Sequence, residues 1–281
     1  MQTRLLARVA IATLAVCGTS DAVLAGSVTQ PGETVGIATG APLPEGFYFV
    51  DTADWGQRNT SPESTSVGVN IPVLAWSTPW TLLGGRLQFL AAAPQVAVGE
   101  ADTDFASGMY NPYFAGQLAW DLGNNFGFSY AIGAYIRVDN EVAFDSTSLN
   151  QRFALSYTGN DWNLTANAIW GIHEHGFTET VNPNFLNIDL TATKKFDKWE
   201  IGPVGFYSTD LNRPVPDYHK QSQFAVGGLV GYNFGPVTLQ AYVTTDVWER
   251  NYGGRDTRGW ARVIIPLGNP FAAPAPEMVS K

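Results

Sequence analysis

A two-residue alternation between apolar residues and small or polar residues runs through most of this chain and restricts it to a β fold. In the clearest segment, 126–138, Phe128, Ile132 and Val138 belong to the apolar set that occupies every second position. The segments 162–173, 186–193 and 223–234 repeat the pattern. Successive side chains of a strand point to opposite faces, so a period of two predicts strands with one apolar face.

The lengths of the connections favour a membrane barrel over a β-sandwich. Transmembrane barrels have short periplasmic turns and longer extracellular loops, a rule that a sandwich has no reason to follow. We expect strands at 46–57, 66–76, 80–93, 110–122, 126–138, 151–158, 162–173, 185–196, 199–210, 222–234, 237–248 and 258–267. The short connections are then 77–79, 123–125, 159–161, 197–198 and 235–236, and the long ones are 58–65, 94–109, 139–150, 174–184, 211–221 and 249–257. The sequence therefore predicts an all-β fold, a transmembrane up-and-down antiparallel β-barrel of about 12 strands.

Aromatic residues flank all five short connections. Rings of this kind sit well at the membrane surface, because they combine an apolar body with a polar edge. The pairs are Trp76 and Trp80, Trp120 and Phe126, Tyr157 and Trp162, Phe196 and Trp199, and Tyr232 and Phe234. One pair does not fit the alternation, since Trp76 and Trp80 fall out of register with the apolar residues of 67–73.

The first 25 residues have the pattern of a secretory signal peptide. Arg4 and Arg8 precede a short apolar stretch, and 23–25 resembles a cleavage site that ends in Ala25. The apolar stretch is too short to cross a bilayer, which needs about 20 residues. A lipoprotein anchor at Cys17, the only cysteine, is the weaker alternative, because a small residue is expected directly before the cysteine and Val16 stands there.

We therefore expect four segments along the chain. They are a signal peptide at 1–25, a short periplasmic N-terminal segment at 26–45, a transmembrane barrel at 46–267 and a C-terminal tail at 268–281. Cleavage after Ala25 would leave a mature chain without cysteine, and hence without disulfide or thiol chemistry.

Charge and motifs exclude several classes of function. The formal net charge of −9 argues against nucleic acid as a partner, because phosphate binding needs a basic surface. The chain has no phosphate-binding glycine loop, cysteine metal site or nucleophile elbow. His173 and His175 could bind a metal, although a solvated loop edge is the simpler interpretation. Ser156 lies too far along the barrel from His173 to form a catalytic pair, and Ser148 belongs to an expected loop. We expect no cofactor, no metal and no enzymatic activity.

The polar face of the barrel offers candidates for a constriction. Six large residues stand about seven or eight positions above the short turns, roughly 19 Å along the barrel axis for strands tilted by about 40°. Twelve strands should leave a narrow channel that side chains can constrict. We predict that these six line the constriction and set its selectivity: Arg86, Gln117, Arg152, Asn167, Asp189 and Tyr242. The alternative is a structural salt-bridge network that plugs the barrel.

Four short segments, taken in order, resemble one family of outer-membrane proteins. They are 42–49 (PLPEGFYF), 111–113 (NPY), 199–205 (WEIGPVG) and 231–237 (GYNFGPV). They are similar to the bacterial family named for the meta-pathway of phenol degradation, which includes sphingosine-responsive proteins, and the resemblance covers about 40–267.

This resemblance implies an outer-membrane channel or transporter for small solutes, often aromatic or hydrophobic ones, with outer-membrane lipids around it and no catalytic residues. The alternative function is a non-transporting structural or surface-binding outer-membrane protein. The substrate and the oligomeric state stay open.

Overall fold

The computed structural model describes residues 26–60, 64–100, 105–174 and 182–271. The expected signal peptide at 1–25 and most of the expected C-terminal tail lie outside these ranges. Within them, no helix is long and apolar enough to cross a membrane.

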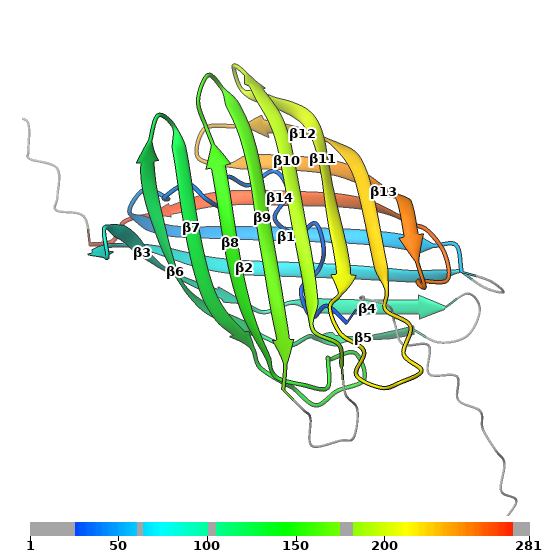
Figure 1. The fold of residues 1–281 in the computed structure, drawn as a ribbon. Helices are drawn as coiled ribbons and strands as arrows, with labels where there is room; N and C mark the ends of the chain where they lie inside the picture. Colours follow the sequence, from blue (N-terminus) through cyan, green and yellow to red (C-terminus); the bar gives the residue numbers. More distant parts are fainter. Residues whose placement is uncertain (1–25, 61–63, 101–104, 175–181, 272–281) are drawn as a thin grey trace, which may run out of the picture.

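The strands form one antiparallel sheet that closes on itself, because β1 pairs with both β2 and β14 (Figure 1). The strands are β1 (Gly46–Arg58), β2 (Thr65–Leu82), β3 (Gly85–Ala92), β4 (Gln95–Glu100), β5 (Phe105–Met109), β6 (Tyr113–Gly123), β7 (Phe126–Tyr135), β8 (Ser148–Tyr157), β9 (Trp162–His173), β10 (Phe185–Phe196), β11 (Trp199–Asp210), β12 (Ser222–Asn233), β13 (Thr238–Arg250) and β14 (Asp256–Gly268).

Two pairs of these strands are halves of longer strands, which reconciles the fourteen segments with a twelve-stranded barrel. β2 pairs with β3 along one half of its length and with β4 along the other half. β5 pairs with β4, as β6 does with β3. The breaks fall at Pro94 and Pro112, which lack the backbone N–H that a sheet ladder requires. The predicted fold class is confirmed.

Two of the expected connections are wrong, and proline has a part in both. Within 94–109, expected to be a loop, β4 and β5 pair with each other, because Pro94 interrupts the ladder without ending the strand. The stretch 77–79 is not a turn, since β2 continues to Leu82 with a register shift between Ser77 and Thr81. The turn lies instead at Leu83 and Gly84, which have positive φ angles of 51° and 77°. Trp76 departs from the alternation because Val69 and Ile71 point into the barrel, whereas Trp76 packs with the exposed rings of Trp80 and Phe89.

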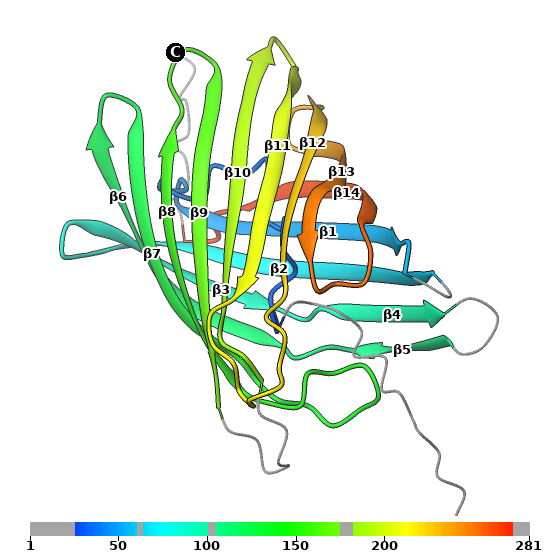
Figure 2. The same ribbon diagram turned by 45° about the vertical axis from the view of Figure 1, so that its right-hand side comes forward.

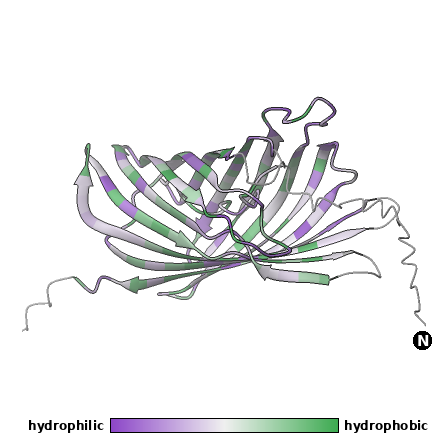
Figure 3. Ribbon diagram, turned by 90° about the horizontal axis from the view of Figure 1, so that it is seen from below, coloured by the Kyte–Doolittle hydropathy of each residue, from purple (hydrophilic) through white to green (hydrophobic). Residues whose placement is uncertain are grey.

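Apolar and polar residues alternate along the strands (Figure 3), and burial shows that the outer face is apolar while the inner face is largely polar. Ile132, Leu190 and Val243 point outward and are exposed, as are rings near the short turns such as Trp199 and Phe196. Residues one position away, such as Asp189 and Thr191, are buried inside the barrel. An apolar exterior with an aromatic belt is the surface that a bilayer requires, because hydrocarbon replaces water around it.

Most of the N-terminal segment, residues 26–45, lies inside the barrel rather than in the periplasm as expected from the sequence (Figures 1 and 2); only Pro44 and Glu45 at its end are exposed. It begins beside His173 and Asp210, at the end with the long connections. It passes Ser156, whose Oγ accepts a hydrogen bond from Gly40 N at 2.9 Å, and reaches β1 at the end with the short turns. A segment without regular structure can be buried here because inward polar side chains of the barrel satisfy its backbone groups.

Candidate functional site in the barrel lumen

Asp189 on β10 anchors the middle of the N-terminal segment. Its two carboxylate oxygens accept hydrogen bonds from Gly32 N at 2.8 Å, Thr34 N at 2.9 Å and Thr34 Oγ1 at 2.6 Å. Two positions further along the same face, Thr191 Oγ1 accepts a hydrogen bond from Gly36 N at 2.7 Å. A single strand therefore satisfies three backbone N–H groups, at every second position from Gly32 to Gly36, in a segment that has no regular structure of its own.

Arg262 on β14 holds the same turn from the opposite wall. Its guanidinium donates to the carbonyl oxygens of Glu33 and Val35 at 2.6 and 2.5 Å. It also donates to Gln240 Oε1 and to the Tyr242 hydroxyl, each at 2.9 Å. Five guanidinium donors suit several carbonyl acceptors at once. Arg262 was not among the residues expected from the sequence, although the alternation along the last strand puts it at an inward-facing position.

Arg152 on β8 forms a buried ion pair with the N-terminal segment. Its Nη1 lies 2.9 Å from Glu33 Oε1, and the two side chains keep only 13% and 9% of their surface exposed. The guanidinium also donates to Asn150 Oδ1 at 2.9 Å and stacks over the Tyr113 ring. The charge of Arg152 is therefore balanced by a residue of the segment and is not presented to an open pore.

The six residues predicted for the constriction do not all lie together. Four of them, Arg152, Asn167, Asp189 and Tyr242, contact the stretch 29–36 of the N-terminal segment. Gln117 bonds instead to Gln88 on the neighbouring strand, at 2.7 Å.

Arg86 was placed at the wrong height. It follows the turn at 83–84 by two residues, because the turn does not lie at 77–79, and it pairs with Glu45 at 2.9 Å near that end of the barrel. The role of the six residues in selectivity stays a prediction.

A second charge cluster lies in the wall near the long connections. Arg258 pairs with Asp54 and with Asp256, the latter at 2.7 Å. Arg58 lies 3.7 Å from Asp256 and 3.9 Å from Asp246. These side chains are almost fully buried, so each guanidinium needs the carboxylates that surround it. Among the described residues no group of three or more His, Cys, Asp or Glu side chains is arranged to hold a metal ion.

Part of the inner surface is apolar, which sets this barrel apart from a water-filled porin. Inward residues of β2, β4, β6 and β7 pack with Ile169 of β9 and Phe185 of β10. Val28 of the N-terminal segment packs against them. The inner apolar wall is the part of this cluster that belongs to the barrel: Val69, Ile71, Ala92, Val96, Tyr110, Tyr113, Ala115, Tyr135, Ile169 and Phe185. A small cavity of about 10 Å³ lies between this wall and Gln30 and Glu33 of the segment. That space admits about one water molecule, so a larger solute needs the segment or the wall to move.

Ser148 and His173 form a hydrogen-bonded pair beside the start of the N-terminal segment. Ser148 lies in β8 rather than in the expected loop, and its Oγ is 2.5 Å from His173 Nδ1. His173 Nε2 is 2.6 Å from the Gly26 carbonyl oxygen. A carbonyl only accepts, so Nε2 carries the hydrogen and Nδ1 accepts from the serine hydroxyl. The pair therefore fixes the Gly26 carbonyl. His175 lies outside the described residues.

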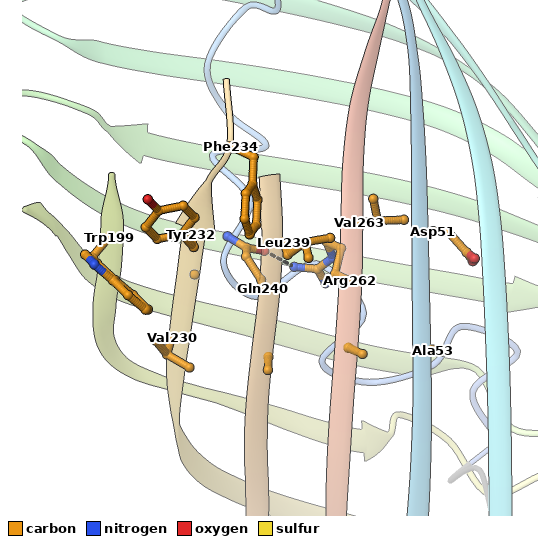
Figure 4. Close-up of a pocket in the computed structure, with 13 residues that line it drawn as sticks. Asp51, Ala53, Trp199, Val230, Tyr232, Phe234, Leu239, Gln240, Arg262 and Val263 are labelled. Carbon is orange, nitrogen blue, oxygen red and sulfur yellow. Dashed lines mark hydrogen bonds between the residues drawn. The ribbon is translucent and has the colours of Figure 1, made fainter. Parts of the chain in front are cut away.

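An apolar hollow near the short turns faces the lipid rather than the lumen (Figure 4). It has a volume of about 480 Å³, and its exposed apolar lining includes Trp199, Val230 and Leu239. Gln240 and Arg262, which hydrogen-bond to each other, also line it. Hydrocarbon chains of the bilayer fill such a hollow in the membrane.

Comparison with solved structures places the fold among outer-membrane barrels. An outer membrane channel from Pseudomonas putida F1 is similar with a TM-score of 0.64 and 14% identity, over 84% of this chain and 99% of that chain. The β domain of the Bordetella autotransporter BrkA has a TM-score of 0.49 and 10% identity, over 79% and 100%. The CymD monoaromatic hydrocarbon channel has a TM-score of 0.45 and 9% identity, over 85% and 93%. The first likeness shows a shared fold.

The family is shown by the sequence itself. No curated protein sequence matches the chain significantly. The model of the family described as MetA-pathway of phenol degradation matches residues 49–263, which is more than half of the chain and nearly the whole barrel. Together with the closed barrel and its apolar exterior, this match confirms the resemblance and the location expected from the sequence. The chain belongs to the phenol-degradation MetA-pathway family and is a β-barrel of the bacterial outer membrane.

Proposed function

We propose that this protein is an outer-membrane channel for small apolar solutes, aromatic ones included, which pass between the inner apolar wall and the N-terminal segment. The observation that carries the proposal is the inner apolar wall. Barrel lumens that conduct hydrophilic solutes are polar, whereas here Val69, Ile71 and Val96 face the lumen beside Tyr110 and Tyr135. The P. putida protein that shares the fold is an outer membrane channel, which agrees with a role in passage.

The polar side of the lumen then has a different role from the apolar side. Asp189, Arg262 and Arg152 hold the N-terminal segment and so close most of the cross-section to hydrated solutes. A hydrated solute would have to break these buried polar contacts to pass, which is costly. An apolar solute meets only the wall on the other side, where it exchanges one apolar contact for another. We assign a structural role to Ser148 and His173, because both are buried and the pair holds the Gly26 carbonyl through His173 Nε2.

The proposal is tested by the entry of an apolar aryl dye, such as N-phenylnaphthylamine, into intact Gram-negative cells, whose lipopolysaccharide slows such molecules. The test variant is Val69→Thr with Val96→Thr, which adds two hydroxyls to the wall with little change in volume. The matched control is Val243→Thr on the lipid-facing side, where the side chain is 56% exposed.

We expect expression of the protein to accelerate dye entry, the inner variant to lose most of that gain, and the outer control to keep it. Liposome swelling with sugars should be slow for all three. A dye rate equal to that of cells without the protein would contradict the channel and favour the non-transporting alternative. A fast rate in the inner variant would contradict the path along the wall.

A further inference from the structure

We propose that the α-amino group created by cleavage between Ala25 and Gly26 forms a buried ion pair with Asp210, which locks the N-terminal segment into the lumen. The inference rests on one carboxylate oxygen, Asp210 Oδ1, that has no hydrogen-bond partner among the described residues, on the position of Gly26 beside it, and on the cleavage pattern at 23–25. It does not depend on the solute that the protein carries.

Asp210 stands at the end of β11 and is only 1% exposed. Its Oδ2 accepts hydrogen bonds from the Tyr218 hydroxyl at 2.6 Å and from Gln221 N at 2.8 Å. Its Oδ1 has no hydrogen-bond partner among the described residues. A buried carboxylate oxygen without a donor is costly, so this atom is suited to a cation or a strong donor.

Gly26 brings such a donor to the right place. A Cβ built on Gly26 would lie 2.9 Å from Asp210 Oδ1. Two substituents of one tetrahedral carbon are about 2.5 Å apart, so the Gly26 nitrogen lies no further than about 5.4 Å from that oxygen, the sum of this spacing and 2.9 Å. The same Cβ would lie 2.4 Å from Pro183 Cγ, which favours a residue without a side chain at this position.

Cleavage changes what the Gly26 nitrogen can do. In the precursor it is an amide with one hydrogen and no charge. Hydrolysis adds the hydroxyl of a water molecule to the Ala25 carbonyl carbon and its hydrogen to the Gly26 nitrogen. The resulting amine has an ordinary pKa of about 7.7–8.0, so at neutral pH most of it takes up a proton and carries three donors and a positive charge. The freed end can rotate about its Cα–C bond to reach Oδ1.

Neighbouring contacts already hold the rest of this end. His173 Nε2 donates to the Gly26 carbonyl, and Asn187 Nδ2 donates to Ser27 Oγ at 2.8 Å. The ammonium group would add an ion pair with Asp210 to these two hydrogen bonds. The segment is continuous with β1 at its other end, so an ion pair here fixes both ends of a chain that otherwise has no regular structure.

The test compares three forms of the mature protein: the natural chain, Asp210→Asn, and a refolded chain with two extra alanines before Gly26. Asp210→Asn removes the charge but keeps a carbonyl acceptor of the same shape. The extension moves the ammonium group away from Asp210 without changing the barrel. Asp246→Asn serves as the matched control, because Asp246 is a buried carboxylate near the same end of the barrel that faces Arg58.

The first measurement is the mass of the mature protein from outer membranes, which should begin at Gly26; any other start overturns the proposal. The second is the rate at which an α-amine-selective reagent labels each folded form near neutral pH. The natural chain and Asp246→Asn should react about tenfold more slowly than Asp210→Asn and the extended chain, since hydrogen bonds to charged groups are among the stronger ones.

A thermal-unfolding comparison by heat-modifiable gel migration completes the test. Asp210→Asn and the extension should each lower the transition temperature, and combining them should lower it no further, because both remove the same contact. Equal labelling rates in the natural chain and Asp210→Asn, or additive losses in the combined form, would overturn the proposal.

Discussion

Replacing Glu33 by Gln should loosen the N-terminal segment, because it removes the carboxylate that balances Arg152. Breaking a buried ion pair by removing one partner costs about 3–5 kcal/mol, since the remaining charge is left in a poor environment. Arg152 retains Asn150 Oδ1 at 2.9 Å, the Tyr135 hydroxyl at 3.2 Å and the Tyr113 ring. These contacts keep part of its stabilisation, so we expect the lower end, about 3 kcal/mol.

The loss should fall on the position of the segment more than on the barrel. The barrel strands keep their ladders in this variant, whereas the segment loses its only ion pair to β8. Single-channel recording in planar bilayers should therefore show larger or more frequent openings in Glu33→Gln than in the natural protein. The double variant Glu33→Gln with Arg152→Met should return towards the natural record, because no unpaired charge is left inside.

The control is an exposed ion pair of similar length. Arg137 and Asp145 lie 2.5 Å apart, but their side chains are 30% and 38% exposed. Arg137→Ala should cost at most about 1 kcal/mol and leave the openings unchanged, because water screens and replaces the pair. A Glu33→Gln channel as quiet as the natural one would refute the view that this pair holds the segment in place.

Three further outcomes are expected. Ile132→Arg should lower the free energy of unfolding, measured with urea in bilayers, by about 2–4 kcal/mol if its site is near the bilayer midplane, because a charge would face hydrocarbon. The control Ile132→Leu should be nearly neutral. Similar losses in both variants would mean that this face does not meet lipid. Arg86→Ala should leave ion selectivity unchanged, because Arg86 pairs with Glu45 near the short turns, and a shifted reversal potential would return it to the constriction. A tag inserted within 213–217 should be labelled on intact cells and one at Lys198 only after permeabilisation, and the reverse pattern would invert the topology.

The sequence alone determined the wall of this barrel, because a strand's facing is a local property. Alternation of side chains identified most strands and showed that Ile132 and Leu190 face outward while Asp189 and Arg152 face inward. The same reasoning failed where proline changes pairing without ending a strand. Pro79 lies within β2 and Pro94 joins β3 to β4, so neither marks the connection that its residue type indicates. Arg86 was misplaced for this reason alone.

Only the tertiary structure decided what fills the lumen. The N-terminal segment has no period to read, and its hydrogen bonds join residues far apart in the chain, such as Thr34 with Asp189 and Glu33 with Arg262, which are 155 and 229 positions apart. The apolar wall behind it was hidden for a related reason. Val69 and Val96 occupy inward-facing positions, and on most other strands those positions are polar. The two residues meet only because β2 and β4 are neighbours in the closed sheet. Local patterns decide which way a side chain points, and closure of the barrel decides what it meets there.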